Sequence, residues 1–345
     1  MLSPLWSVLL IPLLVAMFLA VNMGASGTAP AFSAAYGANL IRREMIPGIF
    51  GIVVFAGALL AGKRVSLTIG RGIIPAELLT VPMVTIVLLA VGLSLLAANL
   101  LRIPQSTSQA TVFALAGPGL YFGRFSGSRL WTEIIPTWFI LPVIAFAVTW
   151  LLGRFIYRPL QRRGALRFEQ LAGHPVWRGI VIGGSLYVAF AIGSNNVANA
   201  AGPIAAMMGN ELGLVPDTAG FGLILIAATL VVAPCFGIGS SLMGSRVLET
   251  TGRQIVTFGP MGATLIAVVT ASLLLVASLS RGIPTSLVQM NVAAILALGI
   301  VKEGWRPILS RSALPRLVTV WIIAPLIAMA LSTGLTALAD RMGWL

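Results

Sequence analysis

Residues 193–203 read Gly-Ser-Asn-Asn-Val-Ala-Asn-Ala-Ala-Gly-Pro, which places three amides, a hydroxyl and a helix-breaking Gly-Pro pair in an otherwise apolar chain. Hydrocarbon offers an amide no hydrogen-bond partner, so such a patch at membrane depth needs protein, water or a bound solute around it. We therefore interpret this stretch as a binding site built into a membrane bundle.

The composition is that of an integral membrane protein. The 345 residues are 58% hydrophobic and only 9% charged, with a mean hydropathy of +1.00. A spanning helix needs roughly 20 apolar residues, and several of the apolar runs are shorter and interrupted by Gly or Pro. We expect an all-α polytopic membrane protein with about ten to twelve membrane segments, some of them broken helices or re-entrant hairpins. The apolar runs are Leu5–Met23, Ile46–Ala61, Leu78–Leu101, Ile134–Leu152, Gly179–Ile192, Phe221–Ile238, Met261–Leu279, Pro284–Val301 and Val318–Leu338.

The net charge of +13 comes largely from clustered basic residues. Positive loops mark the cytoplasmic side of a membrane protein, so the central basic loop is predicted to be cytoplasmic. This distribution indicates lipid contact rather than a nucleic-acid partner. The central loop carries Arg154, Arg158, Arg162, Arg163, Arg167 and Arg178, and a second cluster carries Lys302, Arg306, Arg311 and Arg316.

Residues that carry enzyme or metal chemistry are scarce. The chain has one cysteine, Cys235, and one histidine, His174, which exclude a multi-cysteine metal site and an intramolecular disulfide. A P-loop, a Gly-x-Ser-x-Gly elbow and paired carboxylates within an apolar run are also missing from the sequence. We therefore predict a protein that is not an enzyme and that has no cofactor and no metal site.

The chain repeats itself in order. Residues 62–73 match residues 244–255 at seven positions, and residues 102–109 share Ile-Pro-x-Ser-x-x-Gln with residues 282–289. A weaker match pairs residues 24–31 with residues 193–200. Duplicated halves with interrupted segments at matching positions indicate a secondary transporter whose site lies near the midplane, between the repeats.

The duplication divides the chain into three parts. We predict a first transmembrane repeat over residues 1–153, an Arg-rich cytoplasmic linker over 154–178 and a second repeat over 179–345. The halves are expected to have inverted topology.

The amides of the opening stretch suit an oxyanion. Asn195, Asn196 and Asn199 offer donors, and a helix that starts among them directs free N–H groups at a bound anion. Asn195 and Asn199 are four residues apart and can share one helix face. The alternative is that these amides only join neighbouring helices.

The two Ile-Pro motifs each begin a helix, with Pro near the first turn. Hydroxyls near the positive end of the helix dipole can bind an anion without any cationic side chain, whereas the alternative is simple helix capping. The repetition in both halves favours binding. The candidates are Ser106, Thr107 and Ser108 in one motif, Thr285 and Ser286 in the other, and Gln109 and Gln289 about one turn further on.

These motifs resemble the inorganic phosphate transporter (PiT) family. That family has Gly-Ala-Asn-Asp-x-Ala-Asn-Ala in both halves, followed by Gly-x-x-Val-x-x-Thr-Ile and Pro-x-Ser-x-x-His. The resemblance runs from about Asn22 to Gly304. It implies a bundle of two inverted repeats, often a homodimer, that carries a tetrahedral oxyanion with sodium or protons.

The departures from that pattern bear on the substrate. The family's Asn-Asp becomes Ser26-Gly27 in the first half, and its Asp becomes Asn196 in the second. Both family aspartates, which would suit sodium, are therefore replaced. Sulfate is fully ionised near pH 7 and only accepts hydrogen bonds, so a neutral site suits it better than one with a carboxylate. Residues 22–27 and 103–108 are also similar to the bacterial sulfate permease branch of the family.

We therefore predict a sulfate importer of the bacterial inner membrane that works by alternating access, with uptake that is proton-coupled or merely facilitative rather than sodium-coupled. Ser26, Thr28 and the three asparagines would line one side of the site, opposite the hydroxyls of the two Ile-Pro motifs. Glu249 is the one motif carboxylate that could carry a proton. The alternatives are a carrier of phosphate, thiosulfate or molybdate, and a passive anion channel.

Overall fold

The computed structural model describes residues 4–101, 105–125, 127–163, 174–214, 218–309 and 313–345. Within these ranges, the side chains of residues 4–8, 245–257, 309 and 313–318 lie outside the description. The described residues form helices joined by turns and contain no strand, as the sequence predicted.

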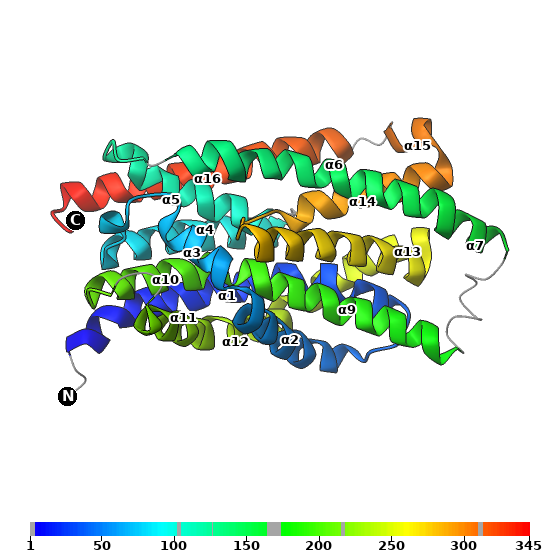
Figure 1. Cartoon of the computed structure of the whole chain (residues 1–345), viewed down its shortest axis with the longest axis horizontal. Helices are drawn as coiled ribbons and strands as arrows, with labels where there is room; N and C mark the ends of the chain where they lie inside the picture. Colours follow the sequence, from blue (N-terminus) through cyan, green and yellow to red (C-terminus); the bar gives the residue numbers. More distant parts are fainter. Residues whose placement is uncertain (1–3, 102–104, 126, 164–173, 215–217, 310–312) are drawn as a thin grey trace.

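The helices follow one another along the chain with short connections (Figure 1). The first half comprises α1 (Pro4–Gly37), η1 (Arg43–Met45), α2 (Ile46–Ala61), α3 (Lys63–Arg71), η2 (Ala76–Leu78), α4 (Val81–Leu101), α5 (Thr107–Tyr121), η3 (Leu130–Ile134), α6 (Ile135–Leu152), η4 (Gly153–Tyr157) and α7 (Arg158–Arg162). The second comprises α9 (Pro175–Asn196), α10 (Ala198–Glu211), α11 (Ala219–Val232), α12 (Pro234–Gly239), η5 (Ser240–Gly244), α13 (Ser245–Ser280), α14 (Leu287–Glu303), α15 (Trp305–Leu309) and α16 (Ala313–Arg341).

Most of these helices run roughly parallel to the long axis of the molecule (Figure 1). In the described part of the chain, eight helical stretches are long and apolar enough to cross a membrane. α5, with 15 residues, and α14, with 17, are not among those eight. α14 lies largely in the predicted run Pro284–Val301, whereas α5 lies outside the predicted apolar runs, and only its start was expected, from the first Ile-Pro motif.

Two long helical stretches are broken. α9 ends at Asn196 and α10 begins at Ala198, inside the asparagine-rich stretch. α13 bends at Gly259, which adopts φ 72° and ψ 170° immediately before Pro260. A positive φ is readily available only to glycine, and Pro260 removes a backbone donor, so both residues favour the bend.

α4 packs against α5 as one hairpin and α13 against α14 as another, the second joined through Ile283-Pro284; residues 102–104, which include the first Ile-Pro pair, lie outside the described residues. α5 packs against α16, whereas α14 packs against α6, so each half supports the hairpin of the other (Figure 1). The two short helices are thereby held within the bundle by packing across the halves, since helices of this length depend on tertiary contacts.

Close helix crossings recur at matching positions of the two halves. A Cβ on Gly24 would overlap the carbonyl oxygen of Phe236, and one on Gly193 would overlap that of Val54. Gly24 and Gly193 are matched in the repeat, and Val54 and Phe236 each lie eight residues before a matched glycine. Glycine at both crossings lets the backbones touch, as is common in membrane bundles.

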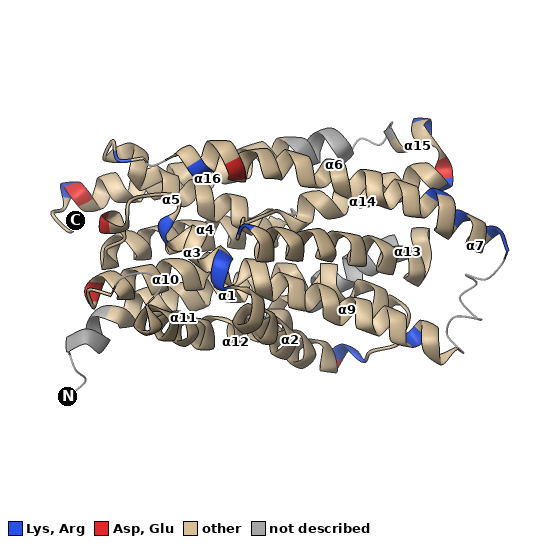
Figure 2. Cartoon of the chain, in the orientation of Figure 1, with Lys and Arg blue, Asp and Glu red and all other residues tan. Residues whose placement is uncertain are grey.

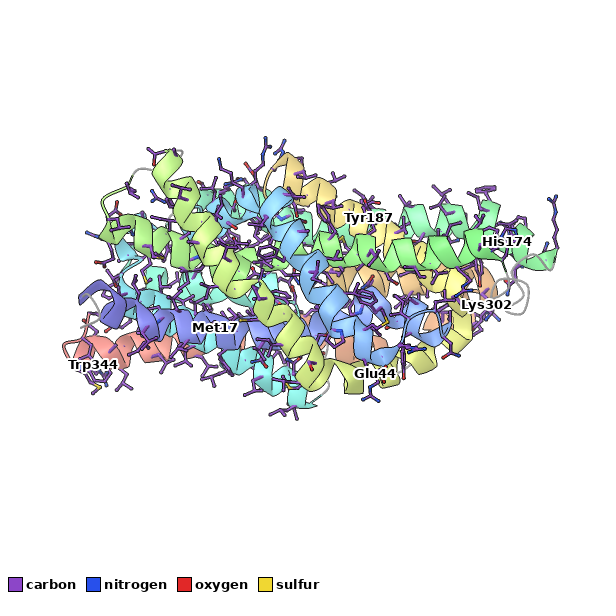
Figure 3. The ribbon with its side chains drawn as sticks, turned by 90° about the horizontal axis from the view of Figure 1, so that it is seen from below. Met17, Glu44, His174, Tyr187, Lys302 and Trp344 are labelled. Carbon is purple, nitrogen blue, oxygen red and sulfur yellow. The ribbon has the colours of Figure 1, made fainter. Side chains whose placement is uncertain are left out.

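Charged residues lie mostly towards the two ends of the long axis. Basic positions gather at the end with α7 and α15, and several acidic ones lie at the opposite end (Figure 2). His174 and Lys302 lie at one end of the molecule, and Trp344 lies at the other (Figure 3). The middle is an apolar core that includes Phe32, Phe50 and Phe236.

Candidate functional site

The break between α9 and α10 lies against the starts of both hairpin helices. Asn195 is fully buried and joins them. Its Nδ2 donates to Ser278 Oγ at 2.9 Å and to the Ile283 carbonyl oxygen at 3.1 Å. Its Oδ1 accepts from the Thr285 backbone N–H at 3.2 Å and from Ser108 Oγ at 3.3 Å. An amide has two donors and two acceptor positions, so Asn195 is saturated.

The short helices α5 and α14 begin in the same way. Ser106 caps α5 by accepting from the Gln109 N–H at 3.4 Å, and Ser286 caps α14 by accepting from the Gln289 N–H at 3.3 Å. Both caps are buried. Two positive helix ends therefore lie near the same buried asparagine, an arrangement that favours negative charge between them.

Gln109 and Gln289 face each other across the halves. Gln109 Nε2 donates to Gln289 Oε1 at 3.1 Å, and Gln289 Nε2 donates to Gln109 Oε1 at 3.3 Å. Each amide uses the other as both donor and acceptor. The two glutamines thus link the two hairpins by hydrogen bonds, and they are also candidate residues for binding the anion.

Two buried oxygens in this region lack a partner among the described atoms, Asn199 Oδ1 and Thr285 Oγ1. Asn199 Nδ2 donates to Ser108 Oγ at 3.3 Å, which connects Asn199 to Asn195. Unpartnered buried polar atoms are costly, so they indicate a place for a bound polar group. Rotating the Asn199 amide by about 180° would place its NH2 group where the unpartnered Oδ1 now lies.

Asn196 and Thr107 are the remaining candidate residues that the sequence predicted on these elements. Asn196 is half-buried, and its amide makes no hydrogen bond to a described residue. Thr107 is buried at the start of α5, and its carbonyl oxygen accepts from Thr111 Oγ1.

Ser26 and Thr28 are not hydrogen-bonded to this network. Ser26 Oγ donates to the Met23 carbonyl oxygen at 3.1 Å, and Thr28 Oγ1 donates to the Gly24 carbonyl oxygen at 2.7 Å. Hydroxyls within a helix commonly bond to the preceding turn. The other nominated residue, Glu249, has a side chain outside the described part of the structure.

The sequence interpretation missed Ser278. Its Oγ accepts from Asn195 and from Ser194 Oγ at 3.3 Å, and donates to the Leu274 carbonyl oxygen at 2.8 Å. The first-half residue at the matching position is Ala98, so the search for repeated polar residues gave no signal there. A serine just before the second Ile-Pro motif was the only available indication.

The buried polar side chains are uncharged throughout the described structure: all are Asn, Gln, Ser or Thr. None of these side chains titrates near neutral pH. Among the described residues, no cluster of three His, Cys, Asp or Glu could hold a metal ion. The site can therefore offer an anion hydrogen bonds and helix dipoles, but not a buried cation.

Comparison with known proteins agrees with this picture. The model of the phosphate transporter family matches residues 23–332. The chain belongs to the phosphate transporter family. This family comprises transporters rather than enzymes, and together with the apolar helices it identifies a multi-pass membrane protein.

Members of the phosphate transporter family differ in the anion that their names specify. Sulfate permease CysP of Bacillus subtilis (strain 168) is 32% identical over 328 residues, which are 94% of this chain and 86% of that one. A solved structure named the sodium-dependent phosphate transporter shares the fold, with a TM-score of 0.78 and 22% identity, covering 97% of this chain and 99% of the other. The family and the sulfate permease support an anion transporter, and the solved structure shows the fold.

Proposed function

We propose that this protein is a secondary active transporter that imports sulfate across the bacterial inner membrane. The observation that carries the proposal is the meeting of two capped, buried helix starts at Asn195, in surroundings whose described polar side chains are all neutral. The similarity to a sulfate permease adds support from the comparisons.

The neutral surroundings favour sulfate over phosphate. Hydrogen phosphate keeps a proton that a carboxylate can accept, whereas sulfate near pH 7 only accepts hydrogen bonds. A carboxylate beside sulfate would repel it. Asn196 holds the position where the resembled family has an aspartate, and this replacement removes a negative charge.

The contacts of Asn195 suggest how sulfate would bind. Asn195 Oδ1 accepts hydrogen bonds from the Thr285 N–H and the Ser108 hydroxyl. An anion could accept hydrogen bonds from the same two donors. A sulfate oxygen would replace this neutral carbonyl oxygen, because a charged acceptor forms the stronger bond. Asn199, with its NH2 turned inward, and the Thr285 hydroxyl would then supply further donors.

Alternating access would move the two halves against each other around this site. The exchange of partners between the halves supports an inverted repeat: α14 packs on α6 and α5 on α16. The paired caps and the reciprocal glutamines lie where an axis relating the halves would pass. The break after Asn196 would let α10 move relative to α9.

Uptake needs a driving force. An inward-negative potential of 100 mV opposes entry of a divalent anion by roughly 4–5 kcal/mol. Two protons per sulfate would make the process electroneutral. We propose proton coupling rather than sodium coupling, because both aspartates of the resembled family are replaced. Glu249 is the candidate proton carrier.

Labelled sulfate uptake into proteoliposomes tests the proposal. We expect uptake without sodium, with excess phosphate competing weakly. Phosphate that competes as strongly as unlabelled sulfate would support the alternative of a phosphate carrier, and the same competition with thiosulfate and molybdate ranks those anions. Counterflow separates a carrier from a channel, since a channel would take up labelled sulfate quickly without exchanging it for internal sulfate.

A further inference from the structure

Arginines of the first half bond to the turn that joins α13 to α14 in the second hairpin. Arg64, at the start of α3, donates from Nη1 to the Ser280 carbonyl oxygen at 2.6 Å. Arg129, just before η3, donates from Nη2 to the Arg281 carbonyl oxygen at 2.8 Å. Arg281 contributes a third guanidinium at the same turn. We call Arg64, Arg129 and Arg281 the arginine surface.

The arginine surface carries an excess of positive charge. The side chains of Arg64 and Arg281 are exposed, and that of Arg129 is 36% exposed. Glu133 offsets part of the charge through an ion pair with Arg129 at 3.5 Å. The side chain of Arg281 makes no hydrogen bond or ion pair to a described residue. Donor positions therefore stay open to a ligand.

This surface lies away from the ends of the bundle. Basic positions occur at α3 and close to it, between the two charged ends of the molecule (Figure 2). Large apolar side chains close to the arginine surface are exposed, as is typical of residues that face lipid: Leu60 is 78% exposed and Leu279 is 51% exposed. Arginines facing hydrocarbon would be costly, so this part of the surface must meet water.

The turn connects this surface directly to the neutral site. Ser278 and Ile283 flank the turn on either side, and both accept hydrogen bonds from Asn195. Gly282 adopts φ +63°, and the Arg64 backbone lies where a side chain at Gly282 would stand. The arginines therefore bond to residues 280 and 281, and the buried asparagine bonds to residues 278 and 283, which lie on either side of them in the same turn.

We propose that the arginine surface is a docking site for free divalent sulfate, which binds there before it enters the neutral site. Guanidinium groups bind tetrahedral oxyanions through paired N–H donors, and a concentrated positive field raises the rate at which anions arrive. The inference rests on the proposed transport of sulfate and adds a second, weaker anion site to it.

The test compares Arg281→Gln with Arg124→Gln in proteoliposomes of neutral lipid. Arg124 is an exposed loop arginine away from this turn, so both variants lose one surface charge. We expect Arg281→Gln to lower kcat/KM for labelled sulfate about fivefold at low ionic strength, with the deficit shrinking as salt screens the field. Arg281→Lys should retain most of the activity, because it keeps the charge.

Each result has one consequence. If Arg281→Gln and Arg124→Gln behave alike at every ionic strength while the wild type transports sulfate, the docking site is disproved and the proposed function stands. If the wild type takes up no sulfate, the proposed function itself fails. If the Arg281→Gln deficit is present only in vesicles with anionic lipid, the surface binds lipid headgroups, and docking of free sulfate is overturned.

Discussion

At the scale of single residues, Asn195 differs from the other candidates because its side chain bonds to both hairpins. Its amide is saturated, and its partners belong to α5, α13 and the turn before α14. Removing it would leave several buried groups without partners. A loss of transport in Asn195→Ala could therefore result from lost sulfate binding or from displaced hairpins. Substitutions of residues around Asn195 separate these two effects better.

Ser278 positions the Asn195 amide. We predict that Ser278→Ala raises the KM for sulfate about fivefold, because one buried hydrogen bond contributes about 1 kcal/mol and 1.4 kcal/mol corresponds to a factor of ten. Ser278→Thr, which keeps the hydroxyl, should restore the affinity. The measurement is the concentration dependence of sulfate uptake.

Ser280→Ala is the matched control, because Ser280 lies two residues further on and its hydroxyl bonds only to its own helix, at the Val276 carbonyl oxygen. An equal KM for Ser278→Ala and the wild type would show that the Asn195 orientation does not depend on Ser278.

The glutamine pair gives a test of stability. Gln289→Leu leaves the Gln109 amide buried without its partner, and we expect unfolding free energy to fall by about 1–3 kcal/mol. Gln109→Leu combined with Gln289→Leu should cost less than the sum of the single changes, because no unpaired amide remains. Thermal unfolding in detergent measures this, and strictly additive losses would contradict a direct pair.

Repetition decided which site residues could be predicted from the sequence. The caps Ser106 and Ser286 and the pair Gln109 and Gln289 recur in both halves. In the structure each serine caps its own helix, and the two glutamines bond to each other. Ser278 has no polar counterpart in the first half, so nothing distinguished it from a serine in a helix. The spacing of residues along the sequence does not determine side-chain rotamers, so the hydrogen bond of Ser26 to its own helix could not be predicted.

At the scale of helices, apolar runs predicted the elements and local chemistry determined their ends. The run Ile46–Ala61 coincides with α2. The run that begins at Pro284 gives a helix only from Leu287, because Ser286 caps it. The partners of the helices could not be predicted, since lipid-facing and buried residues are both apolar in a membrane protein.

The helix crossings predict matched effects of glycine substitution. A Cβ on Gly57 would overlap the Phe190 carbonyl oxygen, and one on Gly239 would overlap that of Val21, at equivalent positions of the two halves. We expect Gly57→Ala and Gly239→Ala each to destabilise the protein by about 1–3 kcal/mol or more, because the backbones must separate.

Gly183→Ala is the control, since a Cβ at this exposed helical position meets no atom within 4 Å. Melting temperatures in detergent compare the three variants. A Gly239→Ala protein as stable as the wild type would contradict the close crossing of α12 with α1.

At the scale of the whole molecule, coupling requires a group that binds and releases a proton. The described buried polar side chains do not titrate near neutral pH. Glu249 is the one carboxylate within the repeated motifs, so it is the nominated proton carrier. We predict that Glu249→Gln removes the acceleration of sulfate uptake by an external acidic pH gradient while sulfate counterflow continues. Loss of both activities together, or of neither, would argue against Glu249 as the proton carrier.

We propose that this site selects sulfate because it lacks a carboxylate, and the ratio of sulfate to phosphate uptake measures that selectivity. We would measure this ratio for the wild type and for Asn196→Asp under the same sodium-free conditions. A carboxylate at position 196 repels fully ionised sulfate more than it repels a phosphate that can donate a proton, so we predict that the ratio falls about tenfold or more. An unchanged ratio, in a variant that folds and still transports, would contradict the claim.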